Sequence, residues 1–255
     1  MIETVRSVDG TTLVFERSGT GPPLVVVGGA LNNRQSPGAL VPLLAGDFTV
    51  VTYDRRGRGG STDTPPYGVD REVEDLAALV DAVGGTALAY GHSSGAILVL
   101  EAAAAGIPLT KLAVYEPPYL TEQRDGPWEV FADKVRALAD EGHRDQAVEA
   151  FIRHTGSDFD PDMPQSPWWP ALTAMANTLP NDLTIARDGA VPAERLSTIG
   201  APVLAVYGGL SAGWAEASTA AVAMAVRNGR QSLLEGQSHG VAPDAMAPLL
   251  LEFFR

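Results

Sequence analysis

The sequence predicts an α/β protein: a mostly parallel sheet of about eight strands, flanked by helices, with a helical cap inserted after the sixth strand. Strand-like and helix-like segments alternate through the first half of the chain. From about residue 119 to 196 only helical periodicity is found, and the alternation then resumes. We therefore predict an α/β core of residues 1–118 and 197–255 and a helical cap of residues 119–196.

The first half of the chain accounts for most of the predicted sheet. Asp9-Gly10 is a typical hairpin turn, and the next two strands are continuous apolar runs, as expected for strands covered on both faces. A helix is expected from Asp70, which can cap it, to the residues before Gly84. The predicted strands here are Thr4–Val8, Thr12–Glu16, Leu24–Val27 and Phe48–Tyr53.

The second half supplies the remaining core elements on either side of the cap. An almost wholly apolar helix follows the fifth strand and should be buried, and several prolines divide the cap into short helices. The predicted elements are strands at Ala87–Tyr90, Leu112–Tyr115, Pro202–Tyr207 and Arg230–Leu234, and helices at Ala96–Ala105, near Glu216–Arg227 and at Pro243–Phe254.

Composition excludes several classes of function. The 255 residues are 45% hydrophobic and 19% charged, as in an ordinary globular protein, and the absence of cysteine excludes disulfides, cysteine-ligated metals and a thiol nucleophile. A net charge of −13 disfavours nucleic acid and anionic membranes as partners. No targeting segment or membrane-spanning apolar run is visible, so we predict a cytoplasmic location.

The segment Gly91-His92-Ser93-Ser94-Gly95 matches the pattern G-x-S-x-G. It follows an apolar strand and opens an apolar helix, which is the context that a nucleophile elbow requires. Ser93 would then lie at a helix N-terminus, where the N–H of Ser94 can face a developing negative charge. The alternative is a glycine-rich turn with an ordinary serine.

With this motif the sequence resembles the α/β-hydrolase family, specifically its capped, cofactor-free members. The resemblance covers essentially the whole chain except the cap, and rests on Gly28-Gly29, Asp54–Gly59, Gly91–Gly95 and Gly236–Gly240. It implies that the N–H of Ala30 is the second oxyanion donor beside Ser94, and that no cofactor is used. The sequence contains no histidine–carboxylate spacing typical of a metal site and no glycine-rich nucleotide motif.

The resemblance also implies which histidine is the general base. His239 follows the last strand in a Gly/Ser loop, where the family keeps this residue. Of the other three histidines, His92 adjoins the nucleophile with its side chain expected to point away from Ser93. His143 and His154 look like polar members of cap helices.

The third member of the triad departs from the family pattern. Most members place an Asp after the strand read here as Pro202–Tyr207, but this loop contains no carboxylate, and Ser211 stands about where the Asp would be. Glu116 ends a neighbouring strand at the carboxyl edge of the sheet and is the preferred replacement, as in some haloalkane dehalogenases. The alternatives are a structural role for Glu116, or another carboxylate such as Asp188.

Further residues are candidates for the substrate pocket. Arg34 could bind a substrate carboxylate, whereas the cap tryptophans are either pocket walls or simple packing. Asp54 with its neighbouring arginines looks like a phosphate site, but the resemblance implies a structural turn beneath the site. The candidate substrate-binding residues are Gly29, Asn32, Arg34, Trp168, Trp169, Met175 and Trp214.

These residues predict a serine hydrolase that cleaves a small carboxylic ester, lactone or related acyl compound through an acyl-enzyme. Ser93 would be the nucleophile, His239 the base and Glu116 the acid. Carbon–carbon bond hydrolysis, perhydrolysis and acyl transfer with the same residues stay open. So does a non-hydrolytic receptor or cyclase. The expected partner is a small-molecule substrate; the sequence identifies neither that substrate nor the oligomeric state.

Overall fold

The computed structural model describes residues 1–119, 126–155, 159–186 and 189–255. Its strands form one sheet in the order β1-β2-β4-β3-β5-β6-β7-β8. The first two strands pair antiparallel, β2 pairs antiparallel with β4, and all other neighbours are parallel. The strands are β1 (Ile2–Arg6), β2 (Thr12–Ser18), β3 (Pro23–Val27), β4 (Thr49–Tyr53), β5 (Ala87–His92), β6 (Leu109–Tyr115), β7 (Val203–Gly208) and β8 (Gly229–Leu234).

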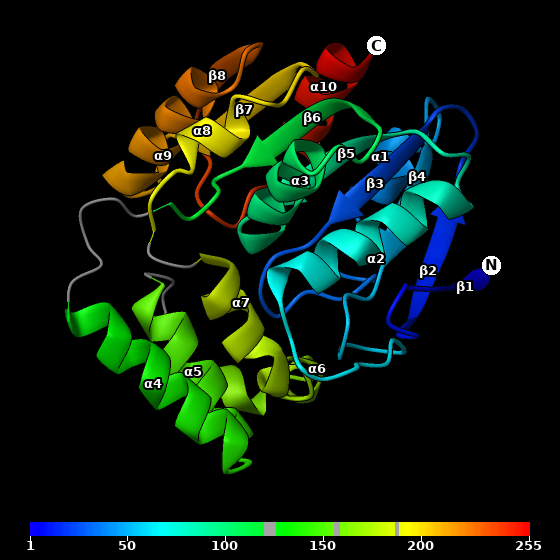
Figure 1. The fold of residues 1–255 in the computed structure, drawn as a ribbon. Coiled ribbons are helices and arrows are strands. Elements are labelled where there is room, and N and C mark those ends of the chain that lie inside the picture. The colour runs from blue at the N-terminus through cyan, green and yellow to red at the C-terminus, as the bar shows by residue number, and fades with distance from the viewer. Residues whose placement is uncertain (120–125, 156–158, 187–188) are drawn as a thin grey trace.

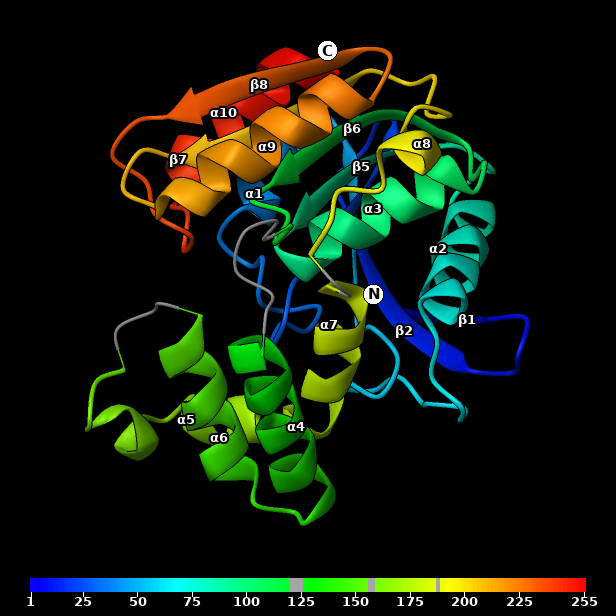
Figure 2. The same cartoon turned by 60° about the vertical axis from the view of Figure 1, so that its left-hand side comes forward.

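Helices cover both faces of this sheet (Figures 1 and 2). On one face α1 (Val41–Leu44) and α10 (Pro243–Phe254) pack against alternate strand residues, with Leu44 and Leu250 fully buried. The other face carries α2 (Val69–Ala82), α3 (Ser94–Ala104), α8 (Ala193–Leu196) and α9 (Gly213–Ala225). Because both faces are covered, the central strands are apolar throughout, which confirms the predicted fold class.

The element boundaries differ slightly from the prediction. The first strand lies two residues earlier, at Ile2–Arg6, and α3 begins at Ser94 instead of Ala96, directly after the G-x-S turn. The N-cap of α2 is Gly68, so Asp70 lies in the first helical turn and does not cap the helix as predicted. None of the helices in the described part of the chain is both long and apolar enough to span a membrane.

Between β6 and α8 the elements of the described chain are all helices. The helices are α4 (Gly126–Asp140), α5 (Arg144–His154), α6 (Trp169–Thr173) and α7 (Leu179–Ala186), with 3₁₀ turns η1 (Met163–Gln165) and η2 (Ala176–Thr178). We call this segment the helical insertion. It has its own apolar core, which includes Val135, Val148 and Leu179, and Leu31 from the loop after β3 packs into it.

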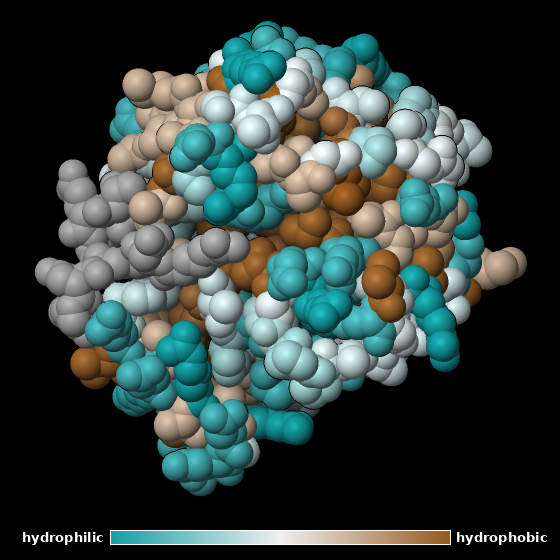
Figure 3. All heavy atoms as spheres, viewed as in Figure 1, coloured by the Kyte–Doolittle hydropathy of each residue, from teal (hydrophilic) through white to brown (hydrophobic). Residues whose placement is uncertain are grey.

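The helical insertion lies beyond one end of the sheet, with α7 nearest to α3 (Figures 1 and 2). On the face shown in Figure 3, hydrophobic residues gather where the insertion meets the rest of the molecule. The end of the sheet that faces the insertion is the carboxyl end of β3, β5 and β6, where parallel α/β sheets place their ligands. The division into a core of residues 1–118 and 197–255 and a cap of residues 119–196 stays a prediction.

Candidate active site

Ser93 lies on a strained turn between β5 and α3. Its backbone has φ 56° and ψ −126°, a conformation that residues other than glycine rarely adopt. A Cβ at Gly91 would lie 2.6 Å from the Cα of Ala96, and one at Gly95 would lie 2.7 Å from the carbonyl oxygen of Gly28. Both glycines are therefore required by close backbone approach, which is the local reason for the G-x-S-x-G pattern.

His239 and Glu116 form a close pair at the same edge of the sheet. His239 Nδ1 lies 2.6 Å from Glu116 Oε2, and the other carboxylate oxygen accepts hydrogen bonds from Gly208 N–H (2.8 Å) and the Ser211 hydroxyl (2.6 Å). Burial alone raises the pKa of the fully buried Glu116. The hydrogen bonds from His239, Ser211 and Gly208 outweigh burial and hold this pKa below its ordinary value.

This pairing fixes the tautomer of His239. Because an ionised carboxylate only accepts hydrogen bonds, Nδ1 carries the proton and Nε2 keeps its lone pair. The loop after β7, where the family pattern expects an Asp, contributes the Ser211 hydroxyl to the carboxylate of Glu116 instead. The other carboxylate considered from the sequence, Asp188, lies outside the described residues.

The backbone that carries His239 is held by two side chains. The hydroxyl of Tyr115 donates to the carbonyl of Ser238 (2.6 Å), and His92 Nε2 lies 2.8 Å from the carbonyl oxygen of His239. A carbonyl can only accept, so His92 Nε2 carries the proton. Burial, with the neighbouring His239 adding to it, lowers the pKa of His92 to about 4, so this ring is neutral at neutral pH.

The loop after β3 passes close to Ser93. A Cβ at Gly29 would lie 2.8 Å from Ser93 Cβ, so only glycine allows this approach. Ala30 and Ser94, the two predicted oxyanion donors, line the same pocket as Ser93 and His239. Within the described residues Ser93 Oγ forms no hydrogen bond to His239, an arrangement often found before substrate binds.

The pocket above Ser93 has a volume of about 130 Å³ and lies between the core and the helical insertion. Its apolar walls come mainly from Trp128, Phe151, Leu183 and Trp214. The ring of Trp214 lies 5.8 Å from that of His239. At the far wall His154 stacks on Phe131, with ring centroids 3.6 Å apart, and burial lowers the pKa of His154.

A buried ionic network forms the base of this pocket. Asp182, from α7, accepts hydrogen bonds from Arg55 Nη1 (2.8 Å), Arg58 Nη2 (2.6 Å) and the Ser94 hydroxyl (2.7 Å). Burial raises the pKa of Asp182, but the charges of the two arginines outweigh it and hold the pKa below the ordinary value. The arginines are thus neutralised by protein carboxylates, which agrees with a structural role for the turn after β4.

Several residues predicted from the sequence lie away from this pocket. Arg34 pairs with Asp54 (2.5 Å) and Glu16 (3.2 Å), so its charge is already compensated. Trp168 is on the surface, whereas Trp169 and Met175 pack in the core of the insertion. Asn32 lines a different cavity and bonds to the carbonyl of Ala30.

Sequence reasoning missed other residues of the pocket, above all Asp182 and the aromatic side chains of α4 and α5. Periodicity marks these residues as helical but does not say which face of the helix meets the core.

Among the described residues, no group of three or more histidine and carboxylate side chains could hold a metal ion.

The fold and this cluster of side chains define a member of a known enzyme family. Residues 24–249 match the model of the alpha/beta hydrolase family, and the chain belongs to that family. It is similar to an alpha/beta hydrolase from Sphaerobacter thermophilus DSM 20745, with 47% identity, a TM-score of 0.90 and coverage of 99% of this chain and 100% of that one.

Two more distant solved structures show the same fold. A bromoperoxidase from Bacillus anthracis is 21% identical with a TM-score of 0.78, over 100% of this chain and 99% of that one. An esterase from Rhodococcus sp. ECU1013 is 23% identical with a TM-score of 0.71, over 99% and 98%. At these identities the likeness concerns the fold alone.

Proposed function

We propose that this protein is a serine hydrolase that cleaves a small carboxylic ester, lactone or related acyl compound. The observation that carries the proposal is the Glu116–His239 pair, 2.6 Å apart, whose histidine lines the same pocket as Ser93 on its strained turn. Ser93 is the nucleophile, His239 the general base and Glu116 the acid that orients it.

The first half of the reaction forms an acyl-enzyme. Ser93 Oγ attacks the carbonyl carbon while His239 Nε2 takes its proton, and the N–H groups of Ser94 and Ala30 stabilise the oxyanion. When the tetrahedral intermediate collapses, the bond to the leaving oxygen breaks and His239 gives it the proton. The buried, ionised Glu116 stabilises the imidazolium formed in between.

The second half releases the acid. His239 Nε2 removes a proton from water, the hydroxide oxygen attacks the acyl carbon, and the bond to Ser93 Oγ breaks as that oxygen regains a proton. One ester and one water therefore give one acid and one alcohol, and no cofactor is consumed.

The pocket favours a small and mainly uncharged acyl group. Its volume of about 130 Å³ suits a few heavy atoms beyond the carbonyl, and its walls are largely aromatic and aliphatic. Asp182 is compensated by two arginines and so leaves no free charge for an ionic substrate. We propose that the helical insertion acts as a cap over this pocket, in a cytoplasmic enzyme without nucleic-acid or membrane partners.

The test is covalent labelling with a fluorophosphonate, read by intact mass. One adduct on the parent and none on Ser93→Ala would support an activated serine beside an oxyanion hole. Hydrolysis of short-chain p-nitrophenyl esters, lost in Ser93→Ala, would then establish the reaction. Absence of labelling and of ester turnover in the folded parent would contradict the proposal and favour a non-hydrolytic receptor or cyclase.

Perhydrolysis is a second candidate, because a bromoperoxidase shares this fold with a TM-score of 0.78. In that reaction hydrogen peroxide replaces water, so the acyl-enzyme gives a peroxy acid and free Ser93. The test incubates an ester with hydrogen peroxide and measures the ratio of peroxy acid to carboxylic acid formed. A ratio higher with the enzyme than without it supports this activity. An equal ratio contradicts it.

A further inference from the structure

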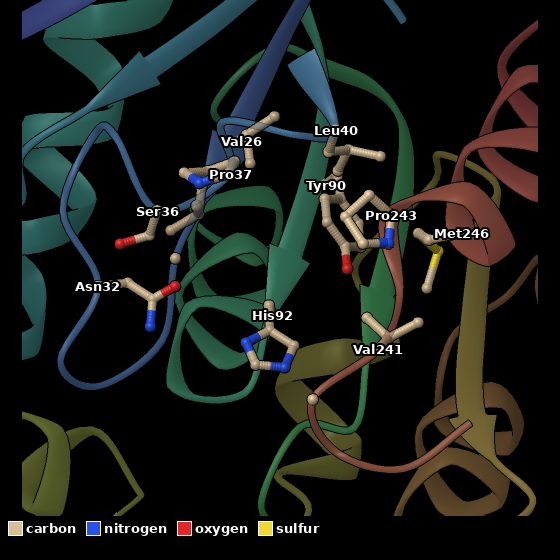
Figure 4. A pocket seen from close by; sticks show the side chains of 13 residues that line it. Val26, Asn32, Ser36, Pro37, Leu40, Tyr90, His92, Val241, Pro243 and Met246 are labelled. Atoms are coloured by element: carbon tan, nitrogen blue, oxygen red, sulfur yellow. The ribbon is translucent and has the colours of Figure 1, made fainter. Parts of the chain in front are cut away.

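A second cavity lies directly behind the candidate active site. It has a volume of about 150 Å³ and is bounded by the loop after β3, the start of α1, His92 and the start of α10 (Figure 4). It shares no lining residue with the pocket above Ser93. The two are nevertheless neighbours, since His92 precedes Ser93 and Gly240 follows His239. We call it the His92 cavity.

The walls of the His92 cavity are mainly apolar and carry no charged side chain. Val26, Leu40, Val241 and Met246 surround it, and Figure 4 shows Val241 and Met246 on the side opposite Asn32. An apolar cavity of this size holds a molecule as large as benzene in other proteins. The volume and lining therefore suit a small, neutral, mainly apolar ligand.

Three polar groups in the lining of the cavity have hydrogen-bonding capacity left over. His92 uses Nε2 to bind a carbonyl, so its neutral ring presents Nδ1 as an acceptor, on the side of Asn32 (Figure 4). Asn32 donates through Nδ2 to Ala30, which leaves Oδ1 as a second acceptor. Within the described residues the hydroxyl of the buried Tyr90 forms no hydrogen bond. Two of these three groups only accept hydrogen bonds, so the lining favours a ligand that donates one.

The same two polar residues support the proposed catalytic groups from behind. His92 holds the carbonyl of His239, the proposed base, at 2.8 Å. Asn32 holds the carbonyl of Ala30, a proposed oxyanion donor, at 2.9 Å. A hydroxyl that donates to His92 Nδ1 or to Asn32 Oδ1 strengthens, through hydrogen-bond cooperativity, the bond that the same side chain makes to the carbonyl.

We propose that the His92 cavity is a second ligand site, which takes a small neutral aromatic or cyclic molecule with one hydroxyl donor, and that its occupancy raises the activity of the site beyond it. Phenol is the simplest probe of this class. The binding part stands on the cavity alone, whereas the effect on turnover rests on the proposed serine hydrolase function.

Binding is tested with methyl-¹³C methionine, because Met246 is one of five methionines and the only one among the described residues that lines the cavity. Phenol should shift the Met246 signal saturably, with a Kd of about 1 mM for so small a ligand. The signals of Met163, Met175 and Met224 should not move, and Met246→Leu assigns the peak. An unmoved Met246 signal, or equal shifts of all methionines, would overturn the site.

Two variants fill the cavity from opposite walls. Leu40→Phe lies on the α1 side and Val241→Phe on the α10 side, so a folding failure of one leaves the other informative. Either should weaken phenol binding at least about tenfold. Toluene, which lacks the donor, should bind the parent at least about tenfold more weakly than phenol. Unchanged phenol binding in a folded variant contradicts the site, and equal binding of toluene contradicts the hydroxyl class.

Coupling is tested on ester turnover with saturating phenol. We expect kcat to rise at least about twofold with KM unchanged. An unchanged kcat with phenol bound at Met246 would overturn the coupling while leaving the binding site intact. If the parent hydrolyses no ester, the methionine spectra still decide whether the cavity binds its ligand, so the two proposals fail separately.

Discussion

Glu116 Oε2 lies 2.6 Å from His239 Nδ1, although the two residues are 123 positions apart in the chain. The carboxylate comes from the end of β6 and not from the loop after β7. The Gly208 N–H at the end of β7 and the Ser211 hydroxyl of that loop donate to the other carboxylate oxygen. Adjacent parallel strands end at the same edge of the sheet, so an acid on β6 reaches the histidine as well as one on β7 does.

Replacing Glu116 with Gln should lower ester turnover by about 10⁴-fold while the fold is retained, because the amide no longer stabilises the imidazolium. The measurement is kcat/KM on a p-nitrophenyl ester, with circular dichroism to check folding. Ser211→Ala is the matched control. It removes one hydrogen bond from the same carboxylate and should cost about tenfold or less. Unchanged turnover in folded Glu116→Gln would contradict the role of Glu116.

The acid should be movable from the end of β6 to the loop after β7. In Glu116→Ala combined with Ser211→Asp, the new carboxylate enters space next to His239 and should recover about 10²-fold of the turnover lost in Glu116→Ala alone. In Ser211→Asp alone, two carboxylates share one site, and like-charge repulsion should reduce activity. Kinetics of the four proteins test this, and a double variant no better than Glu116→Ala would count against it.

The stability that Glu116 contributes should depend on pH. Its pKa lies below the ordinary value of 4.5 in the folded protein, so its contribution is complete above that value and is lost as the pH falls through the folded-state pKa. Urea unfolding of parent and Glu116→Gln should therefore give a difference in unfolding free energy that is largest near neutral pH and shrinks in acid. A difference that grows below pH 4.5 would reverse the sign and contradict the ionised state.

Removing Asp182 should destabilise the protein strongly. Asp182→Ala leaves Arg58 buried without its carboxylate partner and deprives Arg55 of one of two, which should cost about 3–5 kcal/mol in unfolding free energy. Asp133→Ala, which breaks the exposed pair with Arg136, is the control and should cost about 0.5 kcal/mol or less. Chemical denaturation measures the unfolding free energy of both variants. An equally small loss in Asp182→Ala and Asp133→Ala would contradict a stabilising role for the buried Asp182.

Gly29 should tolerate no side chain. In Gly29→Ala the Cβ would lie 2.8 Å from Ser93 Cβ, so the loop or Ser93 must shift, and turnover should fall by about 10²-fold or more. Gly46→Ala is the control, because a Cβ there has no neighbour within 4 Å. The rate of fluorophosphonate labelling reports the effect on Ser93 directly. Equal labelling rates in Gly29→Ala and Gly46→Ala would show that the loop after β3 accommodates a side chain at residue 29.

Local chemistry in the sequence determined the elements and the turn at Ser93. Apolar runs in β3 and β4 predict strands covered on both faces, and the glycines of Gly91–Gly95 predict a turn that only glycine permits at those places. These features depend on residues close together in the chain, so periodicity and turn chemistry express them directly. The placement of His239 as base followed from resemblance to the family and not from its neighbours in sequence.

Only the tertiary structure decided which distant side chains meet. Glu116 was one of several carboxylates that could serve as the acid, and the sequence offers no signal that Asp182 contacts Ser94, 88 residues away. Arg34 looked free to bind a substrate, yet Asp54 compensates its charge. Such contacts depend on how strands are ordered and which helix face turns inward, and those are properties of long-range packing that local patterns do not contain.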